Sequence, residues 1–231
     1  QVLLDAGADI KFESPKGYTV LINIMYALHN DERLVPMAEF LIQHGAETDC
    51  ETDYSESPLS VASLMGRFDA VKVLLAAGAD PSPLCWTELM KAVAIGSSSD
   101  VQRLLRGGGN LDDRDSWERT PWLLSAIVED MTKAQLLLAA GATIDDQDRM
   151  GDTVLMHCST RGKVERLAWL IESGAEIDAI NGFGKSALMC AAEAGKAECV
   201  RLLLKAGANP GHKNEYDENV MSMATTEEVV R

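Results

Sequence analysis

The chain of 231 residues has no apolar run that approaches the ~20 residues a membrane-spanning helix needs, although 46% of its residues are hydrophobic. We therefore expect no membrane insertion. Cysteine is scarce as well, and five residues cannot all pair with one another. Because Cys158, Cys190 and Cys199 fall near packing positions of the repeat described below, reduced structural thiols in a cytoplasmic compartment are favoured over disulfides.

Positively charged residues are also in short supply. The chain has 21 Lys and Arg against 36 Asp and Glu, which gives a net charge of −15. A chain of this charge repels phosphate backbones, so binding to nucleic acid is not expected. The acidity would speed encounter with a basic protein. The alternative is that it serves only to keep the molecule in solution.

What the sequence does contain is a repeat. A pair of bulky apolar residues is followed, three positions after its second member, by glycine, and this happens seven times. The pairs are Leu3/Leu4, Leu41/Ile42, Leu74/Leu75, Leu104/Leu105, Leu137/Leu138, Leu170/Ile171 and Leu203/Leu204. The last four of the glycines that follow are 33 residues apart, and a period of this length indicates stacked supersecondary units.

A second set of residues, with side chains able to cap a helix, recurs at the same intervals. The capping residues are Thr19, Ser57, Thr87, Thr120, Thr153, Ser186 and Asn219. An apolar residue that we expect to point inward follows each of them two positions later: Leu21, Leu59, Leu89, Trp122, Leu155, Leu188 and Met221. A side-chain oxygen at the capping position can accept a free amide of the first helical turn. Each unit is thus predicted to be a polar hairpin, a short helix, a turn and a second helix that ends at glycine.

These motifs resemble those of a known family. The run from Ser57 to Ala62 is similar to the T-P-L-H-x-A opening of ankyrin repeats, and the run from Val71 to Asp80 is similar to their V-x-x-L-L-x-x-G-A-D ending. The chain resembles an ankyrin-repeat protein over essentially its whole length. The resemblance implies an all-α repeat solenoid of stacked helix-turn-helix units with β-hairpin or loop tips.

One departure from the family pattern is consistent along the chain. The histidine that follows the leucine in the family is replaced here by Ile22, Ser60, Met90, Leu123, Met156, Met189 and Ser222. We therefore expect apolar packing to do more of the stacking between units.

We expect a single solenoid over residues 1–231, with about seven units and a partial unit at each end. The expected units are 1–13 (partial), 14–51, 52–81, 82–114, 115–147, 148–180, 181–213 and 214–231 (partial, a cap). Pro81 and Pro83 remove strand donors, which predicts two sub-stacks that meet at about residue 82 and share one continuous core. Because residue 1 is Gln and falls within a second helix, we expect further sequence upstream. That sequence could include an N-terminal targeting segment.

The resemblance implies that a partner meets the concave face, which is formed by the loop tips and the ends of the first helices. The predicted partner-binding residues are Tyr54, Trp86, Trp117, Arg119, Met150, Phe183, Lys185, Tyr216, Met65, Ile95, Val128 and Arg161. Aromatic and arginine side chains with polar neighbours are typical of interface centres. The alternative is that the rings stack along the tips and the helix ends pack in the core.

Motifs that imitate cofactor sites are explained by the repeat. Gly184-Lys185-Ser186 looks like the end of a phosphate-binding loop, but its first glycine and the preceding strand are missing. The acidic runs 112–115 and 145–148 occupy equivalent positions 33 residues apart, so we interpret them as turn-forming.

Metal-binding and nucleophilic sites are weakly supported. His157, Cys158 and Cys190 could be imagined around zinc, but no paired CxxC accompanies them. A cysteine beside a histidine in sequence is not thereby oriented as nucleophile and base. We expect no catalytic residues, no cofactor and no metal.

These observations favour a non-enzymatic protein-interaction module that is monomeric when free. Two alternatives stay open. The chain could be an inhibitor or immunity-type protein that occludes a basic toxin or enzyme, or it could be the recognition arm of a larger enzyme whose catalytic domain lies upstream.

Overall fold

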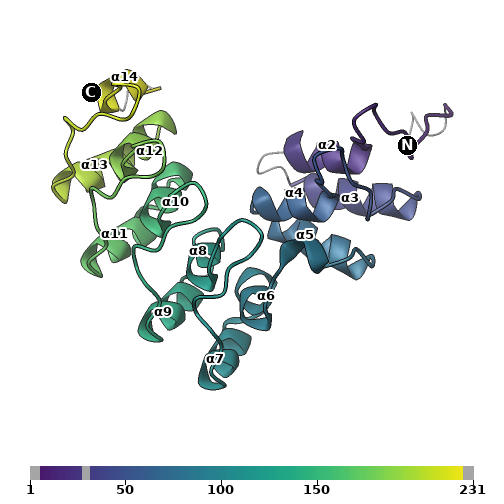
Figure 1. Cartoon of the computed structure of the whole chain (residues 1–231), viewed down its shortest axis with the longest axis horizontal. Coiled ribbons are helices and arrows are strands. Elements are labelled where there is room, and N and C mark those ends of the chain that lie inside the picture. The colour runs from purple at the N-terminus through teal and green to yellow at the C-terminus, as the bar shows by residue number, and fades with distance from the viewer. Residues whose placement is uncertain (1–5, 28–31, 226–231) are drawn as a thin grey trace. The chain divides into compact units, whose positions relative to one another are not determined.

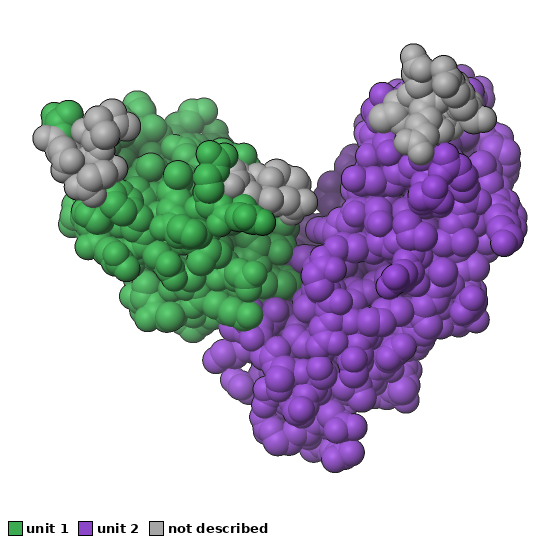
Figure 2. Space-filling model, turned by 180° about the vertical axis from the view of Figure 1, so that it is seen from behind, with its two compact units in different colours: residues 1–87 green, residues 88–231 purple. Residues whose placement is uncertain are grey.

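The computed structural model describes residues 6–27 and 32–225. Leu3 and Leu4 of the first apolar pair lie outside these residues. The chain divides into two compact units, residues 1–87 and 88–231, shown in separate colours in Figure 2. The division lies close to the boundary expected at about residue 82.

The described residues of the first unit form two helix pairs and a short 3-10 turn (Figure 1). Its elements are α2 (Val20–Ala27), α3 (Leu34–Gln43), α4 (Pro58–Leu64), α5 (Phe68–Ala76) and η1 (Ser82–Leu84). Helix α2 packs against α3 and α4, and α5 packs against α3 and α4. Each helix therefore contacts both its partner in the pair and the equivalent helix of the next pair, as in an all-helical repeat solenoid.

The second unit continues the same pattern of helix pairs. Its first helices are α6 (Glu88–Ile95), α8 (Pro121–Ser125), α10 (Val154–Arg161), α12 (Ala187–Glu193) and α14 (Val220–Met223). Its second helices are α7 (Ser98–Arg106), α9 (Met131–Ala139), α11 (Val164–Glu172) and α13 (Ala197–Lys205). The closest packing between equivalent helices joins α6 to α8, α7 to α9, α10 to α12, α11 to α13 and α12 to α14.

Between α8 and α11 the space is filled by two indoles. The Trp122 ring, which occupies a position held by leucine in most units, meets the Trp169 ring edge-on at 6.1 Å between centroids. The Trp122 Nε1–H donates to the Ile144 carbonyl at 3.0 Å. The two indoles therefore supply the apolar contact between these two helix pairs.

The capping residues act as predicted. In the unit around α10, the Thr153 hydroxyl accepts the Met156 N–H, and Ser186 and Asn219 cap α12 and α14 in the same way. The glycines that end the second helices have positive φ, between 83° and 100° at Gly45, Gly78, Gly108, Gly141, Gly174 and Gly207. The helix starts and stops are therefore determined by local chemistry that the sequence displays.

The predicted inward residues form the core with one exception. Leu21, Leu59, Leu89, Trp122, Leu155 and Leu188 are each at most 2% exposed. Met221 was predicted to point inward and is 58% exposed, so that prediction is wrong. Val220 and Met223 of the four-residue α14 are buried in its place, and no second helix within the described residues covers Met221.

The positions that lack the family's histidine are mostly apolar and fully enclosed. Ile22, Met90, Leu123, Met156 and Met189 are each at most 1% exposed. Apolar packing between units therefore replaces a hydrogen-bonded histidine at these positions, as expected.

Buried cations join the helix pairs, and the sequence analysis did not foresee them. Lys133 of α9 is 4% exposed, and its ammonium donates to the carbonyls of Val93 and Gly96 at the end of α6, both at 2.8 Å. Arg166 of α11 similarly donates to the Ser125 carbonyl at the end of α8. These side chains satisfy carbonyls that the end of a helix leaves without a partner.

The loop tips are turns rather than paired strands. Within the described residues, β-pairing is limited to isolated bridges between Gln147 and Thr153 and between Ile180 and Ser186. The tip that contains Pro81 and Pro83 forms the 3-10 turn η1 instead, and Leu84 is buried there. None of the helices in the part of the chain that the structure describes is long and apolar enough to cross a bilayer.

Candidate partner-binding surface

Each loop tip is held by a side-chain oxygen five positions before the capping residue. In the tip at 148–152, the Asp148 Oδ1 accepts the N–H groups of Met150 at 2.9 Å and Asp152 at 3.0 Å. The same pair of bonds is made by Ser14, Thr52, Asp115, Asn181 and Asn214 in their own tips. This confirms the turn-forming role predicted for Asp115 and Asp148, and it makes the tips rigid platforms.

The residue two positions before each capping residue has a left-handed backbone. Glycine occupies this position at Gly17, Gly151 and Gly184, whereas Ser55, Cys85, Glu118 and Asp217 occupy it with φ between 54° and 62°. The turn places the preceding residue at the apex of the tip, where Tyr54, Met150 and Tyr216 are 61%, 47% and 67% exposed. Trp117 and Phe183 at equivalent positions are half-buried.

The predicted contact residues of the first unit are partly engaged by neighbouring tips and helices of the same unit. The Tyr54 hydroxyl accepts from Lys16 Nζ at 3.2 Å, and the same ammonium lies 5.6 Å from the centre of the Tyr54 ring. Trp86 is half-buried with its ring edge-on to Phe68 at 5.7 Å. Met65 at the end of α4 is half-buried.

Two predicted cationic contacts of the second unit are bound by its own carboxylates. Arg119 is only 4% exposed, and its guanidinium pairs with Asp115 at 2.7 Å within the same tip. Lys185 pairs with Glu193 at 2.8 Å; burial lowers the pKa of Lys185, but the bond and charge of Glu193 raise it by more. Both side chains are therefore held by carboxylates of the chain itself, and their contact with a partner stays a prediction.

The ends of the first helices in the second unit lie beside these tips. Ile95 and Val128 are half-buried, as is Arg161. Arg161 donates to His157 Nδ1 at 3.3 Å, and burial lowers the pKa of its guanidinium.

Neighbouring tips of the second unit are joined by backbone bonds where glycine is left-handed. The Met150 carbonyl accepts the Gly182 N–H at 2.8 Å, and the Phe183 carbonyl accepts the Glu215 N–H at 3.3 Å. A Cβ on Gly151 would lie 2.6 Å from the Gly182 nitrogen, so a side chain there would prevent this close approach.

The junction between the tips at 115–119 and 148–152 is different, and we refer to residues 116–118 with 149–150 as the open junction. Glu118 stands where the later tips have glycine, and within the described residues no backbone hydrogen bond joins the two tips. Arg149 spans the junction instead. Its guanidinium donates to the Ser116 carbonyl at 2.8 Å and lies 5.7 Å from the centre of the Trp117 ring.

The Trp117 side chain has an unsatisfied polar group. Its Nε1–H is shielded from solvent and has no hydrogen-bond acceptor among the described residues. A buried donor without an acceptor is costly, and such groups in native structures call for an explanation.

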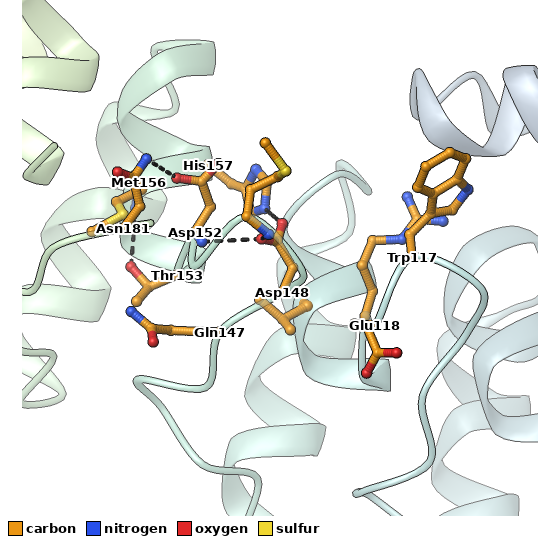
Figure 3. A network of polar contacts seen from close by, with 12 residues as sticks. Trp117, Glu118, Gln147, Asp148, Asp152, Thr153, Met156, His157 and Asn181 are labelled. Atoms are coloured by element: carbon orange, nitrogen blue, oxygen red, sulfur yellow. Dashed lines mark hydrogen bonds and ion pairs between the residues drawn. The ribbon is translucent and has the colours of Figure 1, made fainter. Parts of the chain in front are cut away.

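A polar network lies behind the tip at 148–152 (Figure 3). Asp148 Oδ2 contacts His157 Nε2 at 2.9 Å, and Asp152 accepts from Asn181 Nδ2 at 2.7 Å. Burial raises the pKa of Asp148, but its contact with His157 and the N–H groups of Asp152 and Met150 lower it by more, so the net shift is downward.

This network is also where a metal could be imagined, because Asp148, Asp152 and His157 place ligand atoms within 4.8 Å of one another. The sequence analysis grouped His157 with cysteines instead. Asp148 is already bonded to His157, and Asp152 already accepts from Asn181. The Arg161 guanidinium approaches the remaining His157 nitrogen. The arrangement favours a structural role, since a neighbouring guanidinium opposes a bound cation.

The other imitations of chemical sites have structural roles too. In the run from Gly184 to Ser186, Lys185 is ion-paired and Ser186 caps α12. Burial raises the pKa of the Cys158 and Cys190 thiols to about 12, which keeps them protonated and poorly nucleophilic.

The first unit also has a shallow pocket that the sequence analysis missed. It has a volume of about 320 Å³ and is lined in part by Phe12, Tyr18, Val20 and Ile24. Phe12 is 65% exposed, so the lining is open to solvent. The repeat pattern gave no indication of it, because Phe12 lies between the recurring positions.

Comparison with known proteins agrees with this architecture. A family model described as ankyrin repeats (3 copies) matches residues 1–83, 89–181, 130–214 and 161–231. A search of curated proteins finds no match.

Proposed function

The chain belongs to the ankyrin-repeat family, and from that premise we propose that it is a non-enzymatic module that binds a protein partner through its loop tips and first-helix ends. Ankyrin repeats generally serve as protein-protein interaction modules. The observation that carries the proposal is the set of rigid tips that hold Tyr54, Met150 and Tyr216 exposed at their apices. Side chains whose position is fixed before binding lose little entropy in a complex.

Affinity capture from the cells of origin, followed by mass spectrometry, tests the proposal. The variant Met150→Ala/Tyr216→Ala removes two exposed side chains from the tips of the second unit. The matched control Val164→Ala/Leu204→Ala removes two exposed side chains from the second helices α11 and α13. We expect the tip variant to lose captured partner by about tenfold or more and the control to retain it. Equal capture by both variants would place the contact elsewhere.

The net charge of −15 supports a more specific role as a second candidate. An acidic module could occlude a basic toxin or enzyme, since opposite charge accelerates encounter. Stoichiometric addition of the chain should then abolish the activity of the captured enzyme, and the association rate should fall as salt is raised. A complex in which the enzyme stays fully active would instead support scaffolding.

We further propose that the free chain is monomeric and acts in the cytoplasm, where its five cysteines would stay reduced. Size-exclusion chromatography with light scattering should give the mass of a single 25.0 kDa chain. A dimer mass would contradict the first part of this proposal.

A further inference from the structure

We propose that the open junction, residues 116–118 with 149–150, binds an Asp or Glu side chain of the partner that has an apolar residue beside it. This inference rests on the proposed function and names the chemistry of the group that the tips would hold. It is independent of the partner's net charge, because it concerns one local contact.

The first step in the argument is that, within the described residues, this junction lacks the backbone hydrogen bond that joins the later tips. At Gly151 and Gly184 the tips approach until backbone groups bond directly. At Glu118 the tips are joined by the Arg149 side chain, and the Trp122 and Trp169 indoles meet between the helix pairs of these units. The Trp117 carbonyl and the Arg149 N–H, whose equivalents are bonded in the later junctions, form no such bond with each other.

The second step is that a guanidinium is fixed there without an acid. Arg149 is exposed and held by the Ser116 carbonyl and the Trp117 ring, and no carboxylate in the described residues pairs with it. By contrast, Arg114 and Arg119 pair with Asp146 and Asp115 at 2.7 Å. A planar guanidinium that is already oriented suits a carboxylate, which it can bind through two parallel bonds.

A second guanidinium, that of Arg161, lies behind the same tip and makes no ion pair with its carboxylates within the described residues. Arg161 is half-buried, and its hydrogen bond goes to His157, which contacts the Asp148 that precedes Arg149 in the chain. The carboxylate that acts on Arg161 electrostatically, Asp152, already accepts from Asn181. The tip still carries two carboxylates, Asp148 and Asp152, and Glu118 lies across the junction, so the attraction proposed here is local to the Arg149 guanidinium.

The third step concerns the groups that flank the guanidinium. The Trp117 indole N–H has no acceptor, so the ring loses no hydrogen bond if it turns toward an acceptor that a partner supplies. Met150, directly after Arg149, is 47% exposed and provides apolar surface. A carboxylate with an apolar neighbour matches a guanidinium, an indole and a thioether placed side by side.

A displayed library of random twelve-residue peptides tests the proposal. Peptides are selected on the full chain and counter-selected on the Arg149→Gln chain. We expect enrichment of Asp or Glu next to Leu, Ile, Val, Met or Phe. Enriched peptides, synthesised and titrated by calorimetry, should bind Arg149→Gln at least about tenfold more weakly, with Arg149→Lys between the two because it keeps the charge and loses the planar fork.

The control is Arg201→Gln, which alters an exposed arginine on α13 and should leave binding unchanged. Circular dichroism checks that each variant is folded. The inference is overturned if no peptide is enriched, if the enriched peptides lack acids, or if Arg149→Gln binds them as well as the parent chain does. In those cases the proposed function still stands if the captured partner is lost with Met150→Ala/Tyr216→Ala, whereas failure to capture any partner removes the proposed function itself.

Discussion

At the scale of single residues, the left-handed position of each tip decides how closely neighbouring tips approach. Glycine there permits a backbone bond to the next tip, as Gly151 does by leaving room for Gly182. A side chain in this conformation costs ~1–2 kcal/mol. Glu118 therefore carries this cost at the open junction, where no backbone hydrogen bond joins the two tips within the described residues.

The first prediction separates these two effects. Gly151→Ala should lower the free energy of unfolding by about 2–4 kcal/mol, because it combines positive φ with a contact of 2.6 Å to the Gly182 nitrogen. Gly141→Ala is the matched control, since its φ is +100° but no atom lies within 4 Å of the added Cβ. It should cost only about 1–2 kcal/mol. Urea unfolding of both variants makes the comparison, and equal losses would show that the close approach is unimportant.

The second prediction concerns how the free energy of unfolding changes at acidic pH. The pKa of Asp148 is lowered in the folded chain, so its ionised form stabilises the fold above the ordinary pKa near 3.8, and this contribution is lost as pH falls through the lower folded value. Asp148→Asn should keep the turn, as Asn181 does in its own tip, while losing the carboxylate contact with His157. We expect a loss of about 1 kcal/mol at pH 7 that shrinks as the pH approaches 3.

Urea midpoints measured between pH 3 and pH 7 check this, with Asp112→Asn as the control. The Asp112 side chain is exposed and forms no hydrogen bond within the described residues, so its variant should follow the parent chain at every pH. A deficit of Asp148→Asn that stayed constant down to pH 3 would contradict the assignment.

Single-residue roles were predictable from the sequence where they depend on neighbours along the chain. The caps at Thr153 and Ser186 are local, so the repeat revealed them. The role of Arg119 was not predictable in this way. Its position in the tip suggested an exposed contact residue, whereas the turn brings its side chain back onto Asp115, four residues earlier. The orphaned indole N–H of Trp117 likewise depends on neighbours that the sequence does not display.

At the scale of elements, the helix pairs are joined by cations that enter the core from the second helices. Lys133 of α9 reaches the last carbonyls of α6, and Arg166 of α11 reaches that of α8. A single charge that satisfies two carbonyls links elements about 40 residues apart in sequence, as Lys133 and Val93 are.

The third prediction tests this link. Lys133→Leu should destabilise the chain by about 1–3 kcal/mol, because the carbonyls of Val93 and Gly96 lose their buried donor. Lys91→Leu on the exposed side of α6 is the control and should change the unfolding midpoint little. Hydrogen exchange should show faster exchange of amides in α6 and α9 in Lys133→Leu alone. Unchanged stability would mean that water replaces the ammonium without loss.

Helices were the part of the fold that the sequence predicted best, since apolar spacing, caps and glycine stops all agree on their positions. The prediction failed for Met221, where the repeat register was extended into a helix of four residues without a covering neighbour. It also missed Lys133 and Arg166, because a charged residue in an amphipathic helix is normally read as solvent-facing.

At the scale of the whole molecule, charge opposes compactness. A net charge of −15 makes the folded chain repel itself, and salt screens this repulsion. This repulsion acts among acidic side chains along the whole chain and not within a single tip or helix.

The fourth prediction follows. Raising NaCl from 10 mM to 200 mM should increase the thermal midpoint by about 2–4 °C, equivalent to about 1 kcal/mol. The triple variant Asp112→Asn/Glu165→Gln/Glu172→Gln, which neutralises three exposed acids, should show a smaller increase. Differential scanning calorimetry provides both values. A midpoint that fell with salt would show that attractive ion pairs outweigh the repulsion.

Family and architecture were predictable for most of the chain, because the apolar pairs, the capping residues and the glycines recur once in every helix pair. A division of the chain was expected from Pro81 and Pro83, and it lies between residues 87 and 88. The candidate surface was only partly predictable. Its exposed apices follow from the register, as at Met150 and Tyr216, whereas the open junction depends on contacts between tips, such as Arg149 with Ser116, that the sequence does not display.

The bond between the Met150 carbonyl and the Gly182 N–H has a consequence for how the protein ages. In flexible peptides, an asparagine followed by glycine deamidates readily, because the glycine nitrogen attacks the side-chain amide and ammonia leaves. Here that nitrogen is occupied, and the Asn181 oxygen is held by Phe183 and Lys185 amides. Isoaspartate at position 181, measured by peptide mapping after storage, should accumulate slowly in the parent chain and faster in Gly151→Ala. The rate of its formation then reports how often the two tips separate.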